Sequence, residues 1–448
     1  MKIVIVGNGI SGIFTAQNIR NLDKDVEIDI YSQEKYPYYW RIKIPELISE
    51  RISIDKLIVY KEDWYKNNKI NTYLGKKVIQ IKPYEKSMIN EGEETPITYD
   101  KLVLALGSVP NIPSSIKNAN KMVEKGVFTL RSINDALNIR RFIKEKNVEK
   151  TIIIGGGLLG LELARQIKNC NLDTTVVEFF PRLLPRQLDT ECGDMLKDEI
   201  ERMGIKVVLN AVTEEILVNG GVQGIKLNDG TILNGEMVLI QAGITPTIDV
   251  AKDAGIKTNK GILVNQFLET NFDDIFALGD CIEYNNQIYG IIPACVEQSK
   301  ILASRILGDK KDEYKGTIPK NTLKVVGINL TSIGQFSPPE EHSGGWEILK
   351  KSDKKDCCYQ KIVLKDNKLK GAILFGETKN ITYVSQNMDK VIDKEEMKKL
   401  LELYIWKCPS CGWEYDEAEM QVLFKDLSDD FKCVGCGGSK DEFIKKEV

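Results

Sequence analysis

The feature that most restricts the fold is a pattern that occurs twice: a run of β-branched residues followed directly by Gly-x-Gly-x-x-Gly. The first copy is KIVIVGNGISG at residues 2–12, and the second is TIIIGGGLLG at residues 151–160. A helical stretch and a further strand-like run follow each copy, which is the order of a dinucleotide-binding βαβ unit. One such motif alone is weak, but two in the same context predict an α/β protein with two Rossmann-like dinucleotide-binding domains.

The six glycines of the two motifs have distinct expected roles. The first of each motif makes the tight turn, the second lets the backbone approach a pyrophosphate, and the third lets the helix pack on the strand. The helix N-terminus that follows favours the phosphate charge. These glycines are Gly7, Gly9 and Gly12 in the first unit and Gly155, Gly157 and Gly160 in the second.

An acidic residue about 20 positions beyond the motif usually binds the ribose of the nucleotide. In the first unit Gln33 or Glu34 takes this position, and Arg41 is a candidate cation for the phosphates. In the second unit Glu178 closes the strand-like run TTVVE and is the corresponding residue.

Glu178 also bears on the choice of nicotinamide nucleotide. Its carboxylate would accept from a free 2′-hydroxyl and repel a 2′-phosphate, so we expect NADH rather than NADPH as the donor. Arg182 and Arg186 follow shortly after and weaken this expectation, because an arginine can accommodate a 2′-phosphate.

The C-terminal segment contains two Cys-x-x-Cys pairs, Cys408/Cys411 and Cys433/Cys436, with 21 residues between them. A glycine follows each pair, so backbone amides can point at the thiolates. Four thiolates in a tetrahedral array suit iron or zinc. We therefore expect these four residues to be the ligands of one metal ion.

Charge and composition exclude several classes of function. The net charge of −3 gives no basic surface for nucleic acid, and no apolar run approaches the roughly 18 residues of a membrane-spanning helix. The single histidine, His342, lies in the loop-like stretch EEHSGG and argues against Ser-His, Cys-His or His-metal chemistry. No export signal is recognisable, so we expect a cytoplasmic protein.

The order of these elements resembles the two-dinucleotide-fold flavoproteins, the FAD/NAD-linked reductases. The resemblance covers about residues 1–330 through the motifs GNGISG, LVLALGS, GGGLLGLELA, TTVVE, QAGITP and FALGDC. It implies FAD at the first unit, with Asp280 on the ribityl chain, and a nicotinamide nucleotide at the second, with Glu162 near the nicotinamide–flavin contact. The segment from Ile292 to Gln298 would approach the flavin ring. Lys324 matches a lysine near the flavin, with an ordinary surface lysine as the alternative.

Further contacts to the two nucleotides are expected. Ile10, Ser11, Ala105, Gly107, Leu159 and Gly243 lie in these motifs, and Val78 lies outside them.

Residues 35–50 contain no cysteine, whereas the disulfide reductases that this chain resembles place a redox pair there and the peroxidase-type relatives a single cysteine. We therefore do not expect a thiol relay, and we interpret Cys281 and Cys295 as buried packing residues. The stretch YPYYWR resembles instead the NADH:rubredoxin reductases and their nitrite-reductase-type relatives.

The C-terminal segment resembles rubredoxin, the single-iron electron carrier. The shared features are Cys-x-x-Cys-Gly-x-x-Tyr-Asp at 408–416, the stretch FKDL, and Lys440 followed by Phe443. It departs from that pattern in a shorter segment between the cysteine pairs and in Phe431, which replaces the usual tryptophan. A zinc ribbon has the same cysteine spacing, so iron is the expected metal and zinc the alternative.

Together these features predict four parts: an FAD-binding domain (1–110 and 241–320), an NAD-binding domain (111–240), a small mixed α/β domain (321–403) and a rubredoxin-like Fe(Cys)4 domain (404–448). We expect an NADH-dependent FAD oxidoreductase that passes electrons singly from reduced flavin to the metal centre and on to an external acceptor. By analogy, that acceptor is a diiron or superoxide-reducing protein in oxygen detoxification by an anaerobe. The alternatives are an NADH oxidase that reduces oxygen at the flavin, and a reductase whose tail is a zinc-bound docking module.

Overall fold

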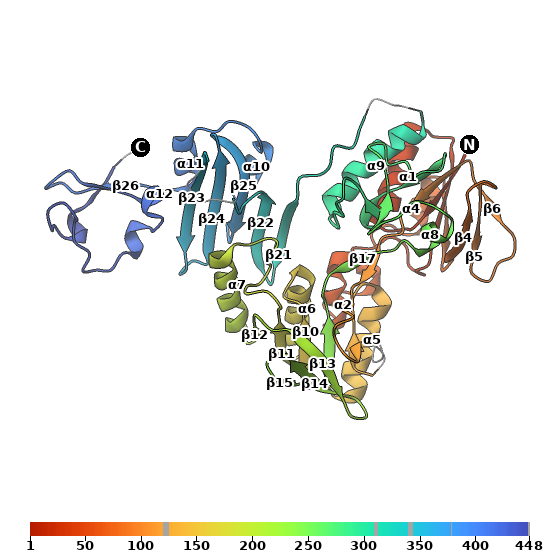
Figure 1. Cartoon of the computed structure of the whole chain (residues 1–448), viewed down its shortest axis with the longest axis horizontal. Helices are drawn as coiled ribbons and strands as arrows, with labels where there is room; N and C mark the ends of the chain where they lie inside the picture. The colour runs from red at the N-terminus through yellow and green to blue at the C-terminus, as the bar shows by residue number, and fades with distance from the viewer. Residues whose placement is uncertain (120–124, 309–311, 339–343, 378, 447–448) are drawn as a thin grey trace. The chain divides into compact units, whose positions relative to one another are not determined.

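The structure is a computed structural model of the chain (Figure 1) and describes residues 1–119, 125–308, 312–338, 344–377 and 379–446. Two compact units are present, residues 1–177 with 211–317 and residues 178–210 with 318–448. Within the described ranges, no helix is both long enough and apolar enough to cross a membrane. His342 lies outside these ranges.

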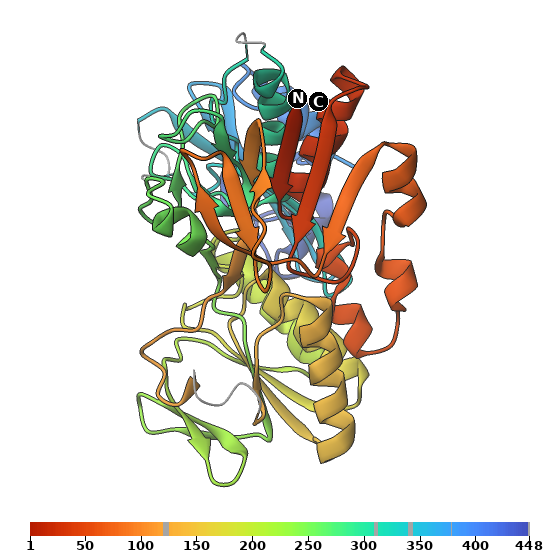
Figure 2. The same cartoon turned by 90° about the vertical axis from the view of Figure 1, so that its right-hand side faces the viewer.

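The first unit contains a five-stranded parallel sheet in the order β19-β7-β1-β2-β3. Its central strand, β1 (Lys2–Val6), is buried from Ile3 to Val6, because an inner strand of a parallel sheet is covered on both faces. Figure 2 shows β1, β2 and β3 side by side, coloured from dark red to orange. The bounds are β2 (Glu27–Ser32), β3 (Ile70–Leu74), β7 (Lys101–Leu104) and β19 (Ile275–Ala277), with helices α1 (Ile10–Leu22) and α9 (Ile292–Ile306) packed against each other.

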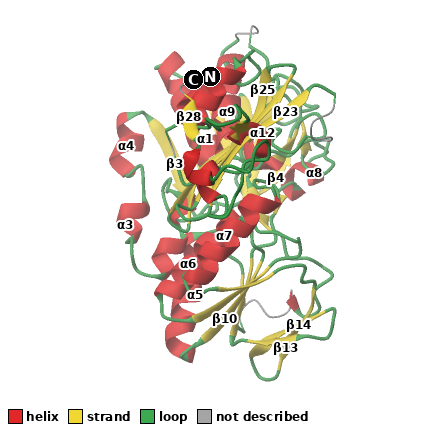
Figure 3. Cartoon of the chain, turned by 90° about the vertical axis from the view of Figure 1, so that its left-hand side faces the viewer, coloured by secondary structure: helices red, strands yellow, loops and turns green. Residues whose placement is uncertain are grey.

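A second parallel sheet in the same unit repeats this arrangement. Its strands β11 (Asp173–Val177), β10 (Lys150–Ile154), β16 (Met237–Ile240) and β9 (Val127–Phe128) are neighbours in that order. Helix α6 (Leu158–Asn169) packs on β10 and β11 (Figure 3), and α5 (Ile133–Lys146) begins at a capping box formed by Ser132 and Asp135. The two predicted Rossmann-like folds are therefore confirmed.

The first unit also contains short helices and small sheets outside the two parallel sheets. They are η1 (Arg41–Lys43), α2 (Pro45–Ile48), α3 (Ile54–Leu57), α4 (Glu62–Asn67), α8 (Asp249–Asp253) and η3 (Gly279–Cys281), with antiparallel β4 (Val78–Lys82), β5 (Ser87–Asn90) and β6 (Ile97–Thr98), antiparallel β13 (Thr213–Val218), β14 (Val222–Leu227) and β15 (Ile232–Asn234), and the pairs β8 (Ser108–Pro110) with β17 (Ile244–Pro246) and β18 (Ile262–Leu263) with β20 (Ile282–Glu283).

The second unit is built on a five-stranded antiparallel sheet, β21 (Lys320–Val325), β22 (Ile328–Gly334), β25 (Lys368–Phe375), β24 (Cys358–Lys365) and β23 (Trp346–Asp353), in that order. Helices α10 (Ile381–Gln386) and α11 (Lys394–Leu401) follow it, and β12 (Lys206–Val208) and α7 (Thr190–Arg202) also belong to this unit. The N-cap residue of α7, Asp189, accepts from Tyr359 Oη at 2.6 Å and from Lys361 Nζ at 3.0 Å.

The C-terminal segment packs on this antiparallel sheet domain. It contains β26 (Ile405–Lys407), β27 (Glu414–Asp416), α12 (Glu417–Met420), η4 (Phe424–Asp426), η5 (Lys440–Glu442) and β28 (Ile444–Lys446). Ala418 and Leu423 share one apolar core with Leu401 and other side chains of the sheet domain. Lys398 lies 2.9 Å from Asp416, and Lys425 pairs with Asp353 of β23. The cysteine-rich segment is thus anchored within the second unit.

Candidate dinucleotide sites and metal centre

The first glycine turn leaves open space only above its second glycine. Gly7 has φ +119°, and a Cβ there would lie 2.1 Å from the carbonyl oxygen of Ala105. A Cβ on Gly12 would lie 1.9 Å from the carbonyl oxygen of Gly7, whereas one on Gly9 would meet nothing within 4 Å. No side chain caps α1 at Gly9. The turn therefore presents free amides and a bare backbone, as pyrophosphate binding requires.

The second glycine turn has the same geometry. Gly155 has φ +116°, and a Cβ there would lie 2.3 Å from the carbonyl oxygen of Gln241. A Cβ on Gly160 would lie 2.0 Å from the carbonyl oxygen of Gly155, and one on Gly157 would again meet nothing within 4 Å. Both turns fit a dinucleotide by the same criterion.

The carboxylate of Glu34 follows β2 and is held by two neighbours. Arg41 Nη2 donates to Glu34 Oε1 at 2.8 Å, and Tyr39 Oη donates to Oε2 at 2.5 Å. Arg41 Nη1 also donates to the carbonyl oxygen of Arg131 at 2.7 Å. Gln33 is exposed, so Glu34 is the better placed of the two candidates for the ribose.

Asp280 lies in a second polar cluster of the first unit. Its Oδ2 accepts from Ser108 Oγ at 2.9 Å and from Arg131 Nη2 at 2.8 Å. Gly279 precedes it with φ +86°, and a Cβ there would lie 2.2 Å from Ser11 Oγ. Gly279, the residue before Asp280, therefore lies against Ser11 at the start of α1.

Sequence reasoning missed Arg131 and Ser108, which complete this cluster. Arg131 connects it to the Glu34 carboxylate through the hydrogen bond from Arg41. The available signal was local: Arg131 directly precedes the capping box at Ser132 that starts α5.

Some of the other predicted contacts lie at the carboxyl ends of parallel strands, where open α/β sheets bind ligands. Ala105 and Gly107 follow β7, and Gly243 follows β16. Ile10 opens α1, and Leu159 and Glu162 lie half-buried at the start of α6.

The rest lie elsewhere. Val78 starts β4 of an antiparallel sheet, and Ile292 is the first residue of α9. Lys324 lies in β21 of the second unit, and its side chain is outside what the structure describes.

Glu178 directly follows β11 and is the first residue of the second unit. It is buried, and its Oε1 accepts from the backbone amide of Phe180 at 2.9 Å. Arg182 donates to the carbonyl oxygens of Leu188 and Pro185 at 2.9 and 3.2 Å. The guanidinium of Arg182 is thus engaged by its own loop.

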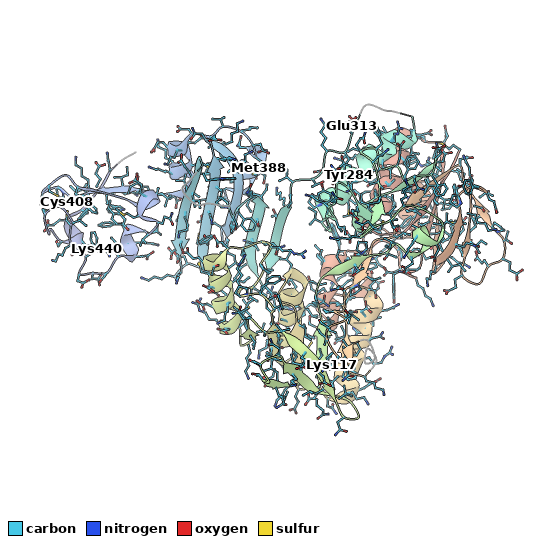
Figure 4. All side chains as sticks on the ribbon, viewed as in Figure 1. Lys117, Tyr284, Glu313, Met388, Cys408 and Lys440 are labelled. Carbon is cyan, nitrogen blue, oxygen red and sulfur yellow. The ribbon has the colours of Figure 1, made fainter. Side chains whose placement is uncertain are left out.

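The four C-terminal cysteines form the metal site that their spacing predicts. All four Sγ atoms lie within 4.8 Å of one another, and the pairs Cys408–Cys436 and Cys411–Cys433 are 3.6 and 3.5 Å apart. A tetrahedral ion with metal–sulfur bonds of about 2.3 Å needs separations of about 3.8 Å. The donor set therefore fits one iron or zinc ion; Figure 4 labels Cys408 in this segment.

The two cysteine pairs sit on matching backbone turns. The amides of Gly412 and Gly437 donate to the carbonyl oxygens of Cys408 and Cys433, and both glycines have positive φ. Although desolvation opposes it, the backbone amides of Cys411 and Ser410 lower the pKa of the Cys408 thiol to about 7. The first turn therefore favours a thiolate at Cys408, the form that binds metal.

An aromatic core surrounds this centre. Trp406 and Phe424 stack with ring centroids 4.5 Å apart, and Phe431 packs beside Trp413, Tyr415 and Phe443. Lys440, labelled in Figure 4, donates to the carbonyl oxygen of Leu427 at 2.6 Å.

Comparison with known families gives two matches. Residues 1–299 match the pyridine nucleotide-disulphide oxidoreductase family, and residues 319–395 match the rubredoxin NAD+ reductase C-terminal domain.

Individual relatives agree with these matches. The chain is 32% identical to the NADH-rubredoxin oxidoreductase of Clostridium acetobutylicum, over 87% of this chain and 94% of that protein. It is similar to the crystal structure of NADH:rubredoxin oxidoreductase from that organism, with a TM-score of 0.69 and 30% identity over 88% and 94% of the two chains. It is also 34% identical to a nitrite reductase [NAD(P)H] of Bacillus subtilis over 89% of this chain, but it spans only 48% of that protein.

Proposed function

The chain belongs to the pyridine nucleotide-disulphide oxidoreductase family, and on this premise we propose that it transfers electrons from NADH through FAD to its own four-cysteine metal centre and then to an outside acceptor. The family is one of NADH-dependent flavin oxidoreductases. The observation that carries the proposal is the four-cysteine cluster on the same chain as the two dinucleotide folds. We keep the four predicted domains as part of this proposal.

FAD would be held at the first glycine turn. The amides at the start of α1 would receive the pyrophosphate, Glu34 the ribose and Asp280 the ribityl chain. Arg41 and Arg131 place positive charge beside these two carboxylates. When bound, FAD supplies the conversion of a two-electron donor into one-electron steps.

NADH would be held at the second glycine turn, with the Glu178 carboxylate on the adenosine ribose. Because the hydrogen bond from the Phe180 amide orients this carboxylate, a 2′-phosphate would meet a fixed negative charge. Arg182 donates to the carbonyl oxygens of Leu188 and Pro185, so its guanidinium is already used within the loop. Of the two arginines that weakened the preference for NADH over NADPH, this one therefore no longer counts as a partner for a 2′-phosphate. We therefore propose NADH as the donor, with Glu162 beside the nicotinamide.

Two buried thiols of the first unit are poor candidates for a relay. Burial raises the pKa of Cys281 to about 12 and that of Cys295 to about 12. Such thiols stay protonated at neutral pH and are weak nucleophiles. The raised pKa values support a route in which electrons leave the reduced flavin without passing through these thiols.

We propose iron as the metal, because the reductase fold and the four-thiolate donor set together match an electron carrier. A cytoplasmic diiron or superoxide-reducing protein as acceptor, in oxygen detoxification, remains a proposal by analogy.

The test is to purify the full chain anaerobically from an iron-replete host and to add NADH. We expect ferric-thiolate absorption above the flavin spectrum and its bleaching by NADH. Cys408→Ser should lose reduction of a one-electron acceptor while NADH still reduces the flavin. Zinc alone in the purified protein would contradict the proposal and support a docking module.

A flavin that reduces oxygen directly gives a different result. Cys408→Ser would then consume NADH and oxygen, and form peroxide, as fast as the unaltered protein.

A further inference from the structure

The loop that follows Glu178 buries its three leucines but leaves two phenylalanines exposed to solvent. Leu183, Leu184 and Leu188 are fully buried, whereas Phe179 and Phe180 are 61% and 47% exposed. Single exposed apolar residues are common on proteins, but two adjacent exposed aromatic rings expose a larger apolar surface to water. These rings lie next to the carboxylate assigned to the adenosine ribose, which suggests that they contact the same nucleotide.

The exposure of the rings is not the result of a loose loop. Arg182 Nε donates to the carbonyl oxygen of Leu188, and the amide of Asn210 donates to that of Phe180 at 3.1 Å. The amide of Glu178 donates to the carbonyl oxygen of Val208 at 2.8 Å. At the far end, Asp189 is held by Tyr359 and Lys361. The backbone under the two rings is therefore fixed on both sides.

The two rings form an ordered pair. Their centroids are 5.2 Å apart and their planes meet at 87°, an edge-to-face arrangement in which one ring supports the other. Since the Phe180 amide also binds the Glu178 carboxylate, the carboxylate and both rings belong to one three-residue arrangement.

We infer that Phe179 is the binding surface for the adenine ring of NADH and that Phe180 supports it from the side. The inference rests on the proposed assignment of NADH to the second glycine turn. Adenine is a flat, weakly hydrated ring that stacks on aromatic side chains, and it is joined directly to the ribose that Glu178 would bind. The three leucines of the loop are buried, and Phe179 is the more exposed of its two aromatic rings, so Phe179 is the aromatic surface that the loop offers for stacking.

The test compares NADH with reduced nicotinamide mononucleotide, which carries the same hydride but no adenine. In Phe179→Ala, we expect the KM for NADH and the inhibition constant of ADP-ribose to rise about 5- to 10-fold, the low end of base–aromatic stacking. With the mononucleotide, the ratio of variant to unaltered kcat/KM should stay near one. Phe179→Tyr should restore the KM for NADH, and Phe180→Ala should raise it by less than Phe179→Ala.

Tyr84→Ala is the matched control, because Tyr84 is an aromatic residue with 92% exposure outside the loop. It should leave the KM for NADH unchanged. An unchanged KM for NADH in Phe179→Ala, or an equal loss with both donors, would overturn the inference. Failure of the unaltered protein to reduce its flavin with NADH would instead contradict the proposed function.

Discussion

At the scale of single residues, some glycines of the two turns are required by the packing of the fold and others by the space that a bound nucleotide occupies. A methyl group on Gly12 would lie 1.9 Å from the carbonyl oxygen of Gly7, so the close approach of α1 to the glycine turn excludes any side chain there. A methyl group on Gly9 meets no protein atom within 4 Å, although the fingerprint requires glycine at that position. Neighbouring glycines of one motif are therefore constrained by different partners.

This contrast predicts opposite behaviour of two alanine variants. Gly12→Ala should lower the free energy of unfolding by about 3 kcal/mol, the upper end of the cost of overpacking. Gly9→Ala should change stability by less than about 1 kcal/mol but weaken FAD binding at least about tenfold, because the methyl group fills the space for the pyrophosphate. Urea unfolding of the apoprotein and titration with FAD measure the two effects. Equal stability losses would contradict the distinction.

The buried thiols of the first unit allow a prediction about pH. With the pKa of Cys281 and of Cys295 at about 12, the thiolate fraction at pH 8 is about 10⁻⁴. Iodoacetamide at pH 8 should leave both residues unmodified in the folded protein and label both in urea, as mass spectrometry would show. Because folding raises these pKa values above the ordinary 9.0, the unfolded thiols ionise first and stability should fall between pH 9 and 12. Rapid labelling of Cys295 in the folded protein would contradict this.

At the scale of elements, the sequence predicted those features whose determinants are close together in the chain. The two strand–glycine–helix units and the two Cys-x-x-Cys turns belong to this class, and the structure has both. Arg131 was missed because its partner Asp280 is 149 residues away, and the capping box beside Arg131 marks the start of a helix but not this pair. The sequence also could not show that Arg182 binds backbone carbonyl oxygens of its own loop. An arginine in that role and an arginine that binds a phosphate look the same in the sequence.

Helix α12 is the element that anchors the metal-binding segment, a connection that spacing alone could not reveal. The short helix and the residues after it bring Ala418 and Leu423 into the core of the antiparallel sheet domain. Two ion pairs, Lys398–Asp416 and Lys425–Asp353, flank this contact. The segment and the sheet domain therefore share apolar packing as well as covalent linkage.

Leu423→Ala should weaken both partners of this contact at once. Truncation of a buried leucine costs about 2–5 kcal/mol, and here the cost falls on a core that the two parts share. Hydrogen exchange should therefore speed up in both β23 and residues 404–446. Met420→Ala is the control, because Met420 lies in α12 but is 46% exposed, and it should change exchange little. Faster exchange in the C-terminal segment alone would show that the core is not shared.

At the scale of the whole molecule, one chain combines a flavin-reductase fold with a four-thiolate metal centre. In a complex of separate proteins, transfer between such centres depends on protein concentration. On the proposed electron route, a covalent connection would replace this with an effective concentration in the millimolar range. The shared core anchors the metal-binding segment in the second unit, so this segment and the sheet domain would move together.

This organisation predicts that electron transfer to the metal centre is a first-order process. After rapid mixing with excess NADH, the rate of ferric-thiolate bleaching should stay the same when the protein is diluted tenfold at constant NADH concentration. A mixture of Cys408→Ser, which keeps the flavin, and FAD-depleted Gly9→Ala, which keeps the metal centre, should bleach only slowly and in proportion to concentration. This outcome follows because micromolar protein in trans cannot match the millimolar effective concentration within one chain. If the unaltered protein also slowed tenfold on dilution, its flavin would be reducing the metal centre of a second copy.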